Sequence, residues 1–126
     1  MARDPGSASF VALAEAYRRQ GRREEALQIC LRGLEKRPTD VAGHALLARL
    51  YLEAGDRVRA CDEWAIVLSL DPDNFEAHRG MGFYQIEQRN LEAALEHLRR
   101  AEAQRPGDRA VREGLSLVRA RLAKRR

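Results

Sequence analysis

The sequence is poor in several residue types on which particular classes of protein depend. Of its 126 residues only 2 are Cys and 4 are Pro, and aromatic residues make up 6%. Two cysteines 31 residues apart provide neither a disulfide framework nor a zinc site, because both need more ligands at closer spacing. No apolar run approaches the roughly 18–20 residues that a membrane-spanning helix needs. The sequence therefore excludes disulfide-rich scaffolds and membrane-spanning helices.

Charged residues make up 33% of the chain, and they are unevenly distributed. The net charge is +4, but residues 105–126 alone carry +6 and the remaining residues carry −2. The N-terminal residues 1–5 lack the apolar segment of a signal peptide, so we expect a cytoplasmic protein. Because 44% of the residues are hydrophobic, we expect a folded domain and not a disordered chain.

A period of 34 residues runs through most of the chain. Pro38, Pro72 and Pro106 follow one another at this spacing, which aligns residues 7–40, 41–74 and 75–108 without a gap. Such a period is typical of repeat proteins in which each unit buries its apolar face against the next. The same spacing relates Tyr17 to Tyr51, Gly21 to Gly55, and Ala26 to Ala60 and Ala94.

Each unit has the pattern of two helices joined by a turn. In the first unit, Phe10, Leu13, Ala14 and Tyr17 form one apolar face at helical period, and Gly21 then interrupts the pattern. A second apolar face follows and ends before the repeated proline. The residue before each following helix is a good N-cap, and these residues are Asp40, Asn74 and Asp108.

These units resemble the tetratricopeptide repeat. The resemblance rests on Leu13, Ala14, Tyr17, Gly21, Ala26 and Pro38 and on their counterparts in the later units. It implies an all-α fold, a right-handed α-solenoid of three helix-turn-helix units closed by a seventh helix. The domains would be an N-terminal lead (1–6), three repeats (7–40, 41–74 and 75–108) and a capping helix with a basic tail (109–126). The third unit departs from the family pattern, since Arg89 and Asn90 replace the loop glycine, and we expect a looser turn there.

No pattern of catalytic, cofactor-binding or metal-binding residues stands out, so we expect neither an enzyme nor a cofactor. His44 and His78 share one repeat position, which suggests a metal site, but Phe10 holds that position in the first unit and no further ligand accompanies it. We expect both histidines to fill packing positions and His97 to face solvent. Cys30 and Cys61 lack a nearby base, so we interpret them as buried apolar side chains.

The resemblance further implies a concave groove lined by the first helix of each repeat, which would bind a partner peptide or helix. Apolar side chains would anchor the partner, while Arg49 and Arg79 would bind a carboxylate; alternatively, these arginines pair with Glu15, Glu53 or Glu76. The groove residues implied are Val11, Glu15, Arg18, Ala45, Arg49, Leu52, Glu76, Arg79, Phe83, Ile86 and Leu117.

One specific activity of the family is not expected. Arrays that bind the C-terminal carboxylate of heat-shock chaperones use Lys, Asn and Arg at fixed positions. At those positions this chain has Val11, Glu15, Leu46, Glu76 and Gly80. We therefore do not expect a heat-shock chaperone tail as partner.

Two alternatives to groove binding remain open. The first helix has no preceding unit to cover it, so the chain could self-associate into a homo-oligomer by end-stacking, or be part of a longer array. Alternatively, the basic residues from Arg119 to Arg126 could bind nucleic acid or an anionic membrane. Since no aromatic side chains lie among them to stack on bases, we do not expect nucleic acid as a partner.

Overall fold

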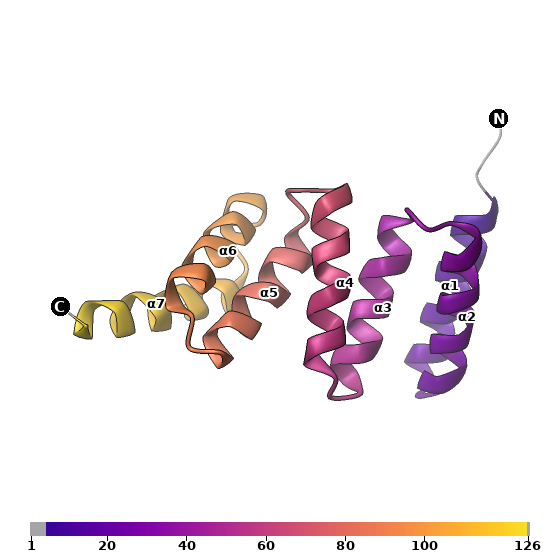
Figure 1. The fold of residues 1–126 in the computed structure, drawn as a ribbon, viewed down its shortest axis with the longest axis horizontal. Helices are drawn as coiled ribbons and strands as arrows, with labels where there is room; N and C mark the ends of the chain where they lie inside the picture. Colours follow the sequence, from indigo (N-terminus) through magenta and orange to yellow (C-terminus); the bar gives the residue numbers. More distant parts are fainter. Residues whose placement is uncertain (1–4, 126) are drawn as a thin grey trace. The chain divides into compact units, whose positions relative to one another are not determined.

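The computed structural model describes the backbone of residues 5–125 and the side chains of residues 10–125 (Figure 1). Within this range the chain forms helices joined by short turns and contains no strand, which confirms the expected all-α fold. Residues 1–4 of the expected N-terminal lead, and Arg126 of the basic tail, lie outside the described residues. The helices are α1 (Pro5–Arg19), α2 (Arg23–Lys36), α3 (Val41–Glu53), α4 (Arg57–Leu70), α5 (Phe75–Glu87), α6 (Leu91–Gln104) and α7 (Arg109–Lys124).

The three hairpin turns share one backbone conformation, which corrects the expectation of a looser third turn. Gly21 and Gly55 have φ angles of 78° and 83°, and Arg89 at the equivalent position has a φ of 61°. The same hydrogen bond closes each turn, for example from Asn90 N to Gln85 O at 2.9 Å. Arg89, and not Asn90, takes the left-handed conformation, because Asn90 is needed as the N-cap of α6.

The predicted N-caps are confirmed at the start of α3, α5 and α7. The Asp40 carboxylate accepts a hydrogen bond from Gly43 N at 2.8 Å. Asn74 Oδ1 accepts from Ala77 N, and Asp108 Oδ2 from Val111 N, both at 3.0 Å. Each cap satisfies a backbone N–H that has no partner within its helix, which stabilises the helix start by about 1 kcal/mol.

The chain divides into two compact units, which we describe separately. Unit 1 ends at Leu70 and contains α1–α4, and unit 2 begins at Asp71 and contains α5–α7. In unit 1, α2 packs against both α1 and α3, and small side chains let the helices approach closely. The buried apolar cluster of unit 1 consists of Ala14, Ala26, Cys30, Leu34, Leu46, Leu47 and Leu50.

In unit 2, α6 packs against both α5 and α7. Leu98 on α6 is fully buried, and a Cβ atom on Gly82 of α5 would lie only 2.6 Å from Leu98 Cδ2. The glycine therefore admits the leucine side chain into the core. The apolar stripe of α7 closes the cluster through Val111, Leu115 and Val118, all at most 1% exposed. None of the described helices is long and apolar enough to cross a membrane.

Candidate functional site

The first helices of unit 1, α1 and α3, are joined by an arginine between two carboxylates. Arg18 donates from Nε to Glu15 Oε1 at 2.6 Å and from NH1 to Glu53 Oε2 at 2.8 Å. A second bond runs from Arg18 NH2 to Glu15 Oε2 at 3.0 Å, so the contact with Glu15 is bidentate. Arg18 thus links a residue on its own helix to the end of α3.

This network leaves Arg18 little capacity to bind an external anion. The hydrogen bond from Arg18 lowers the pKa of Glu15, and the same contact raises the pKa of Arg18. The Arg18 guanidinium and the Glu15 carboxylate therefore neutralise each other. Glu15 and Glu53 both pair with Arg18. The alternative interpretation of the sequence had assigned these two carboxylates to Arg49 and Arg79.

The remaining predicted residues of unit 1 differ in exposure. Val11 and Ala45 are half-buried, and Val11 packs against the core of the unit. Arg49 is exposed, and Leu52 keeps 42% of its surface accessible. Leu52 is therefore the apolar side chain of this helix face that is most available to a partner.

In unit 2 the corresponding face carries a stacked arginine and phenylalanine. The Arg79 guanidinium lies 5.6 Å from the centre of the Phe83 ring, one turn further along α5. Its Nε atom is 3.6 Å from Asp108 Oδ2, which is a long ion pair, and its side chain is 44% exposed. A competing carboxylate could therefore reach Arg79 at little cost.

Other predicted residues of unit 2 serve the core as well as the surface. Phe83 and Ile86 pack against the buried cluster, and a Cβ atom on Gly114 of α7 would lie 3.0 Å from Phe83. Leu117, one turn after Gly114, remains 41% exposed. Glu76 is exposed at the start of α5. Within unit 2, the predicted residues thus bring Arg79 and Phe83 together on the α5 face that meets α7.

His44 belongs to a buried polar contact that the sequence analysis did not identify. Its Nε2 atom donates to the carbonyl oxygen of Pro38 at 2.7 Å, and its Nδ1 atom lies 2.7 Å from Glu63 Oε1. The side chain is almost fully buried, as expected of a packing position. A proton must lie between Nδ1 and the carboxylate, so the residue packs as a hydrogen-bonded group and not as an apolar one.

The expectation that His97 faces solvent is wrong. His97 Nδ1 lies 3.0 Å from His78 Nδ1, and His78 Nε2 donates to the carbonyl oxygen of Pro72 at 2.7 Å. Burial lowers the pKa of His97, and the nearby His78 lowers it further. The residue is half-buried because its ring packs against that of His78, with the ring centres 5.3 Å apart.

The repeat period contained a signal for these contacts. His44 and His78 are 34 residues apart, and so are the residues that they face, Glu63 and His97. In the first repeat, the same two positions are held by Phe10 and Ile29. Comparing both positions of each hairpin together would have predicted paired side chains. Among the described residues no group of three or more potential ligands could hold a metal ion.

The surroundings of each cysteine lower its reactivity, although Cys61 is only partly buried. Cys30 is fully buried, its Sγ lies 3.2 Å from the carbonyl oxygen of Gly43, and burial raises its pKa to about 12. Burial also raises the pKa of Cys61. Since the thiolate is the nucleophile, neither side chain is prepared for catalysis.

Comparison with known families agrees with this geometry. A tetratricopeptide repeat model matches residues 45–109, more than half of the chain, and a second tetratricopeptide repeat model matches residues 1–50. The chain belongs to the tetratricopeptide repeat (TPR) family. None of the curated proteins matches the sequence.

Solved structures show the same fold. The first TPR of Spaghetti (RPAP3), bound to the HSP90 peptide SRMEEVD, matches with a TM-score of 0.85 and 17% identity over 96% of each chain. The first TPR domain of human RPAP3 gives a TM-score of 0.81 with 18% identity, covering 95% of this chain and 94% of that one. The pilF protein of Pseudomonas aeruginosa gives 0.79 with 26% identity, covering 96% of this chain and 55% of that one. This TPR chain therefore has the fold of an all-α helical-repeat solenoid.

Proposed function

We propose that this TPR protein is a non-catalytic interaction module that binds a segment of a partner protein on the first-helix faces of its repeats. The observation that carries the proposal is the α5 face of unit 2. Arg79 is half-exposed above Phe83 and holds Asp108 only at 3.6 Å, while Leu117 on α7 is 41% exposed. A partner with an apolar side chain and a carboxylate fits this combination.

Unit 1 contributes differently to this function. Its Arg18 is already neutralised by Glu15 and Glu53, so binding there depends on the exposed Leu52 and Arg49. We assign Arg18 and Glu15 to joining α1 and α3. An HSP90 tail is not proposed as ligand, although a similar structure binds such a peptide, because Glu15, Glu76 and Gly80 replace the clamp residues.

Site-specific photocrosslinking tests the proposal. A photoreactive phenylalanine at Leu117 should crosslink a partner in extract from the native cell, whereas the same group at Arg99, exposed on α6, should not. With the captured partner purified, Arg79→Glu should weaken binding at least about tenfold, because it replaces attraction for a carboxylate by repulsion.

The matched control is Arg100→Glu, which makes the same charge change at an exposed arginine on α6. It should leave the affinity within about twofold of wild type. Identical crosslinked products from Leu117 and Arg99, or equal losses from the two charge reversals, would show that the first-helix face is not the binding site.

A further inference from the structure

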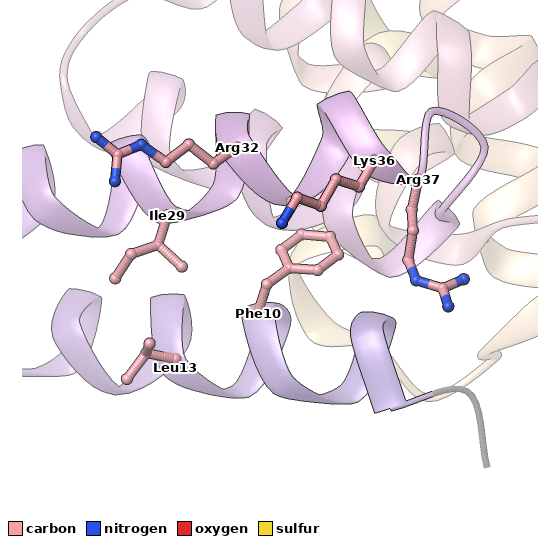
Figure 2. A pocket seen from close by; sticks show the side chains of 7 residues that line it. Phe10, Leu13, Ile29, Arg32, Lys36 and Arg37 are labelled. Atoms are coloured by element: carbon pink, nitrogen blue, oxygen red, sulfur yellow. The ribbon is translucent and has the colours of Figure 1, made fainter.

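A pocket lies between α1 and α2 of the first hairpin, away from the residues proposed to bind a partner above. Leu13 on α1 and Ile29 on α2 point toward one another across it, with Phe10 beside them (Figure 2). The pocket has a volume of about 660 Å³, enough to receive several side chains. Its lining residues are Phe10, Leu13, Ile29, Arg32, Gly33, Lys36 and Arg37.

The repeat period shows what kind of element covers this surface. Leu47 holds the position of Leu13 in the second repeat, and only 2% of it is exposed, whereas Leu13 is 50% exposed. Leu47 is buried in a cluster with side chains of α1 and α2, the hairpin that precedes it. In the second repeat this position is therefore covered by helices, so the shape complementary to the open pocket at Leu13 is also a helix.

The charges around the pocket define the chemistry of that helix. Among the described residues that line it, every charged side chain is basic. Arg32 and Lys36 are both exposed on α2, and the structure shows no ion pair between either of them and any described residue. Arg37 adds a third positive charge at the end of the helix. An occupant with carboxylates beside its apolar side chains would neutralise this rim.

The charge of the chain itself argues against a second copy as the occupant. A second copy could cover this pocket with its α7 helix. The exposed side of α7 carries Arg112, Arg119 and Arg121, and these would meet the basic rim of the pocket. Like charges in contact oppose association, so this pairing is disfavoured.

We propose that the pocket between α1 and α2 binds an amphipathic helix of another protein, with an apolar stripe seated between Leu13 and Ile29 and carboxylates over Arg32 and Lys36. This site is separate from the first-helix faces of the proposed function. Burial of Leu13 and Ile29 supplies the attraction, and the basic rim supplies the preference for an acidic partner.

Two designed peptides test the proposal on the full chain. Both are stapled helices of about five turns with leucine on one stripe, and they differ only in carrying glutamate or lysine beside that stripe. By fluorescence anisotropy, the glutamate peptide should bind saturably and at least about tenfold more tightly than the lysine peptide. The double variant Arg32→Glu/Lys36→Glu should reverse this preference.

Further variants separate this site from the other surfaces. Leu13→Asp should weaken the glutamate peptide at least about tenfold, and since half of Leu13 is exposed the fold should tolerate the change. Arg79→Glu should leave the affinity unchanged, which distinguishes this site from the one of the proposed function. Methyl NMR signals of Leu13 and Ile29 should shift on titration with the glutamate peptide.

Several outcomes would overturn the proposal. These are equal affinity for both peptides, no saturable binding, or an unchanged preference in the Arg32→Glu/Lys36→Glu variant. That variant decides the question even if Leu13→Asp unfolds, because both basic side chains lie on the surface. A wild-type dimer in sedimentation equilibrium that Leu13→Asp dissociates would identify a second copy as the occupant and would equally overturn it.

Discussion

His78 and His97 contact each other through their Nδ1 atoms, 3.0 Å apart, while Nε2 of His78 donates to the carbonyl oxygen of Pro72. A carbonyl can only accept, so neutral His78 has its proton on Nε2 and accepts from His97 at Nδ1. The His78–His97 pair can therefore bind one further proton but not two, because two protonated Nδ1 atoms would face each other. In the preceding repeat, the equivalent contact joins His44 to the carboxylate of Glu63, which accommodates a fully protonated imidazole.

We predict that unit 2 is destabilised by mild acid through His97. Its pKa is lowered in the folded state, chiefly by burial, so the unfolded chain binds more protons. The stability that neutral His97 contributes to the fold is complete above its unfolded-state pKa of about 6.5, and it is lost as the pH falls below that value. Among the neighbouring charges, Glu96 raises this pKa and Arg100 lowers it. The melting temperature, followed by circular dichroism, should therefore decrease from pH 7.5 to pH 5.5.

The variant His97→Glu should remove or invert this decrease. It places a carboxylate opposite His78, as Glu63 is placed opposite His44, so acid then strengthens the contact. The reciprocal variant Glu63→His should make unit 1 acid-sensitive as well. If His97→Glu and wild type lose stability in parallel below pH 6.5, the histidine contact does not determine the acid response.

We predict that Arg89→Gly stabilises the protein. Arg89 has a φ of 61°, which costs a non-glycine residue about 1–2 kcal/mol, and glycine removes this strain. Glycine also increases the entropy of the unfolded chain, so the net gain should be at most about 1 kcal/mol. Urea unfolding measures it. The control Gly55→Arg introduces the same strain at the equivalent turn and should destabilise the protein.

We predict that Gly82→Ala destabilises the core of unit 2 by about 1–2 kcal/mol. The new methyl group would lie 2.6 Å from Cδ2 of the fully buried Leu98, and this overpacking outweighs the better helix propensity of alanine. Gly107→Ala is the matched control, since no atom lies within 4 Å of its added Cβ. Equal free energies of unfolding for the two variants would contradict the packing argument.

We predict measurable coupling between Arg18 and Glu53. A double-mutant cycle with Arg18→Gln and Glu53→Gln should give about 0.5–1 kcal/mol, the value of a partly exposed ion pair. Because Arg18 also holds Glu15 and lowers its pKa, the Glu15 contribution to stability is present above about pH 4.5 and is lost as the pH falls below it. Arg18→Gln should reduce that part of the acid response, and Arg19, which also donates to Glu15, should retain the rest. Zero coupling at pH 7 would refute the bridge.

We predict that Cys30 reacts with thiol reagents only after unfolding. Its side chain is fully buried and burial raises its pKa to about 12, so the thiolate is scarce at neutral pH. Cys61 is partly exposed and should react slowly in the native state. The variant Cys61→Ser leaves Cys30 as the only thiol, and Ellman's reagent should not modify it rapidly unless denaturant is added. Rapid modification of this variant in its native state would contradict the prediction.

The sequence predicted those parts of the fold that repeat with the 34-residue period. The N-caps Asp40, Asn74 and Asp108 follow from chemistry that each position needs locally, and the structure confirms all three. The prediction of a looser third turn was wrong because one residue cannot both cap the following helix and take the left-handed conformation. Asn90 tolerates a left-handed conformation, but it cannot adopt it while capping α6, so Arg89 takes the strained position.

The functional side chains were harder to predict, because their state depends on contacts between helices. The position of Arg18 on a first helix was deducible, yet its neutralisation by Glu53, 35 residues away, required the packing of α1 against α3. Similarly, His97 looked isolated because its partner lies 19 residues earlier on another helix. Side-chain pairing across a hairpin becomes visible in a sequence only when both positions are compared between repeats.

The contact between α1 and α2 has a consequence for how this array could evolve. Phe10 and Ile29 are apolar where the later hairpins carry a histidine and a hydrogen-bonding partner, and the Phe10 ring fills the space beside Gly33 and Gly43. A gene duplication that copied the second hairpin would reproduce a complete polar pair at its new location. A duplication of the first hairpin would copy Gly33 together with the ring, but the hairpin that follows one copy would carry Ser9, and not glycine, at the repeat position of Gly43. Lengthening by internal duplication is therefore easier from the second or third hairpin than from the first.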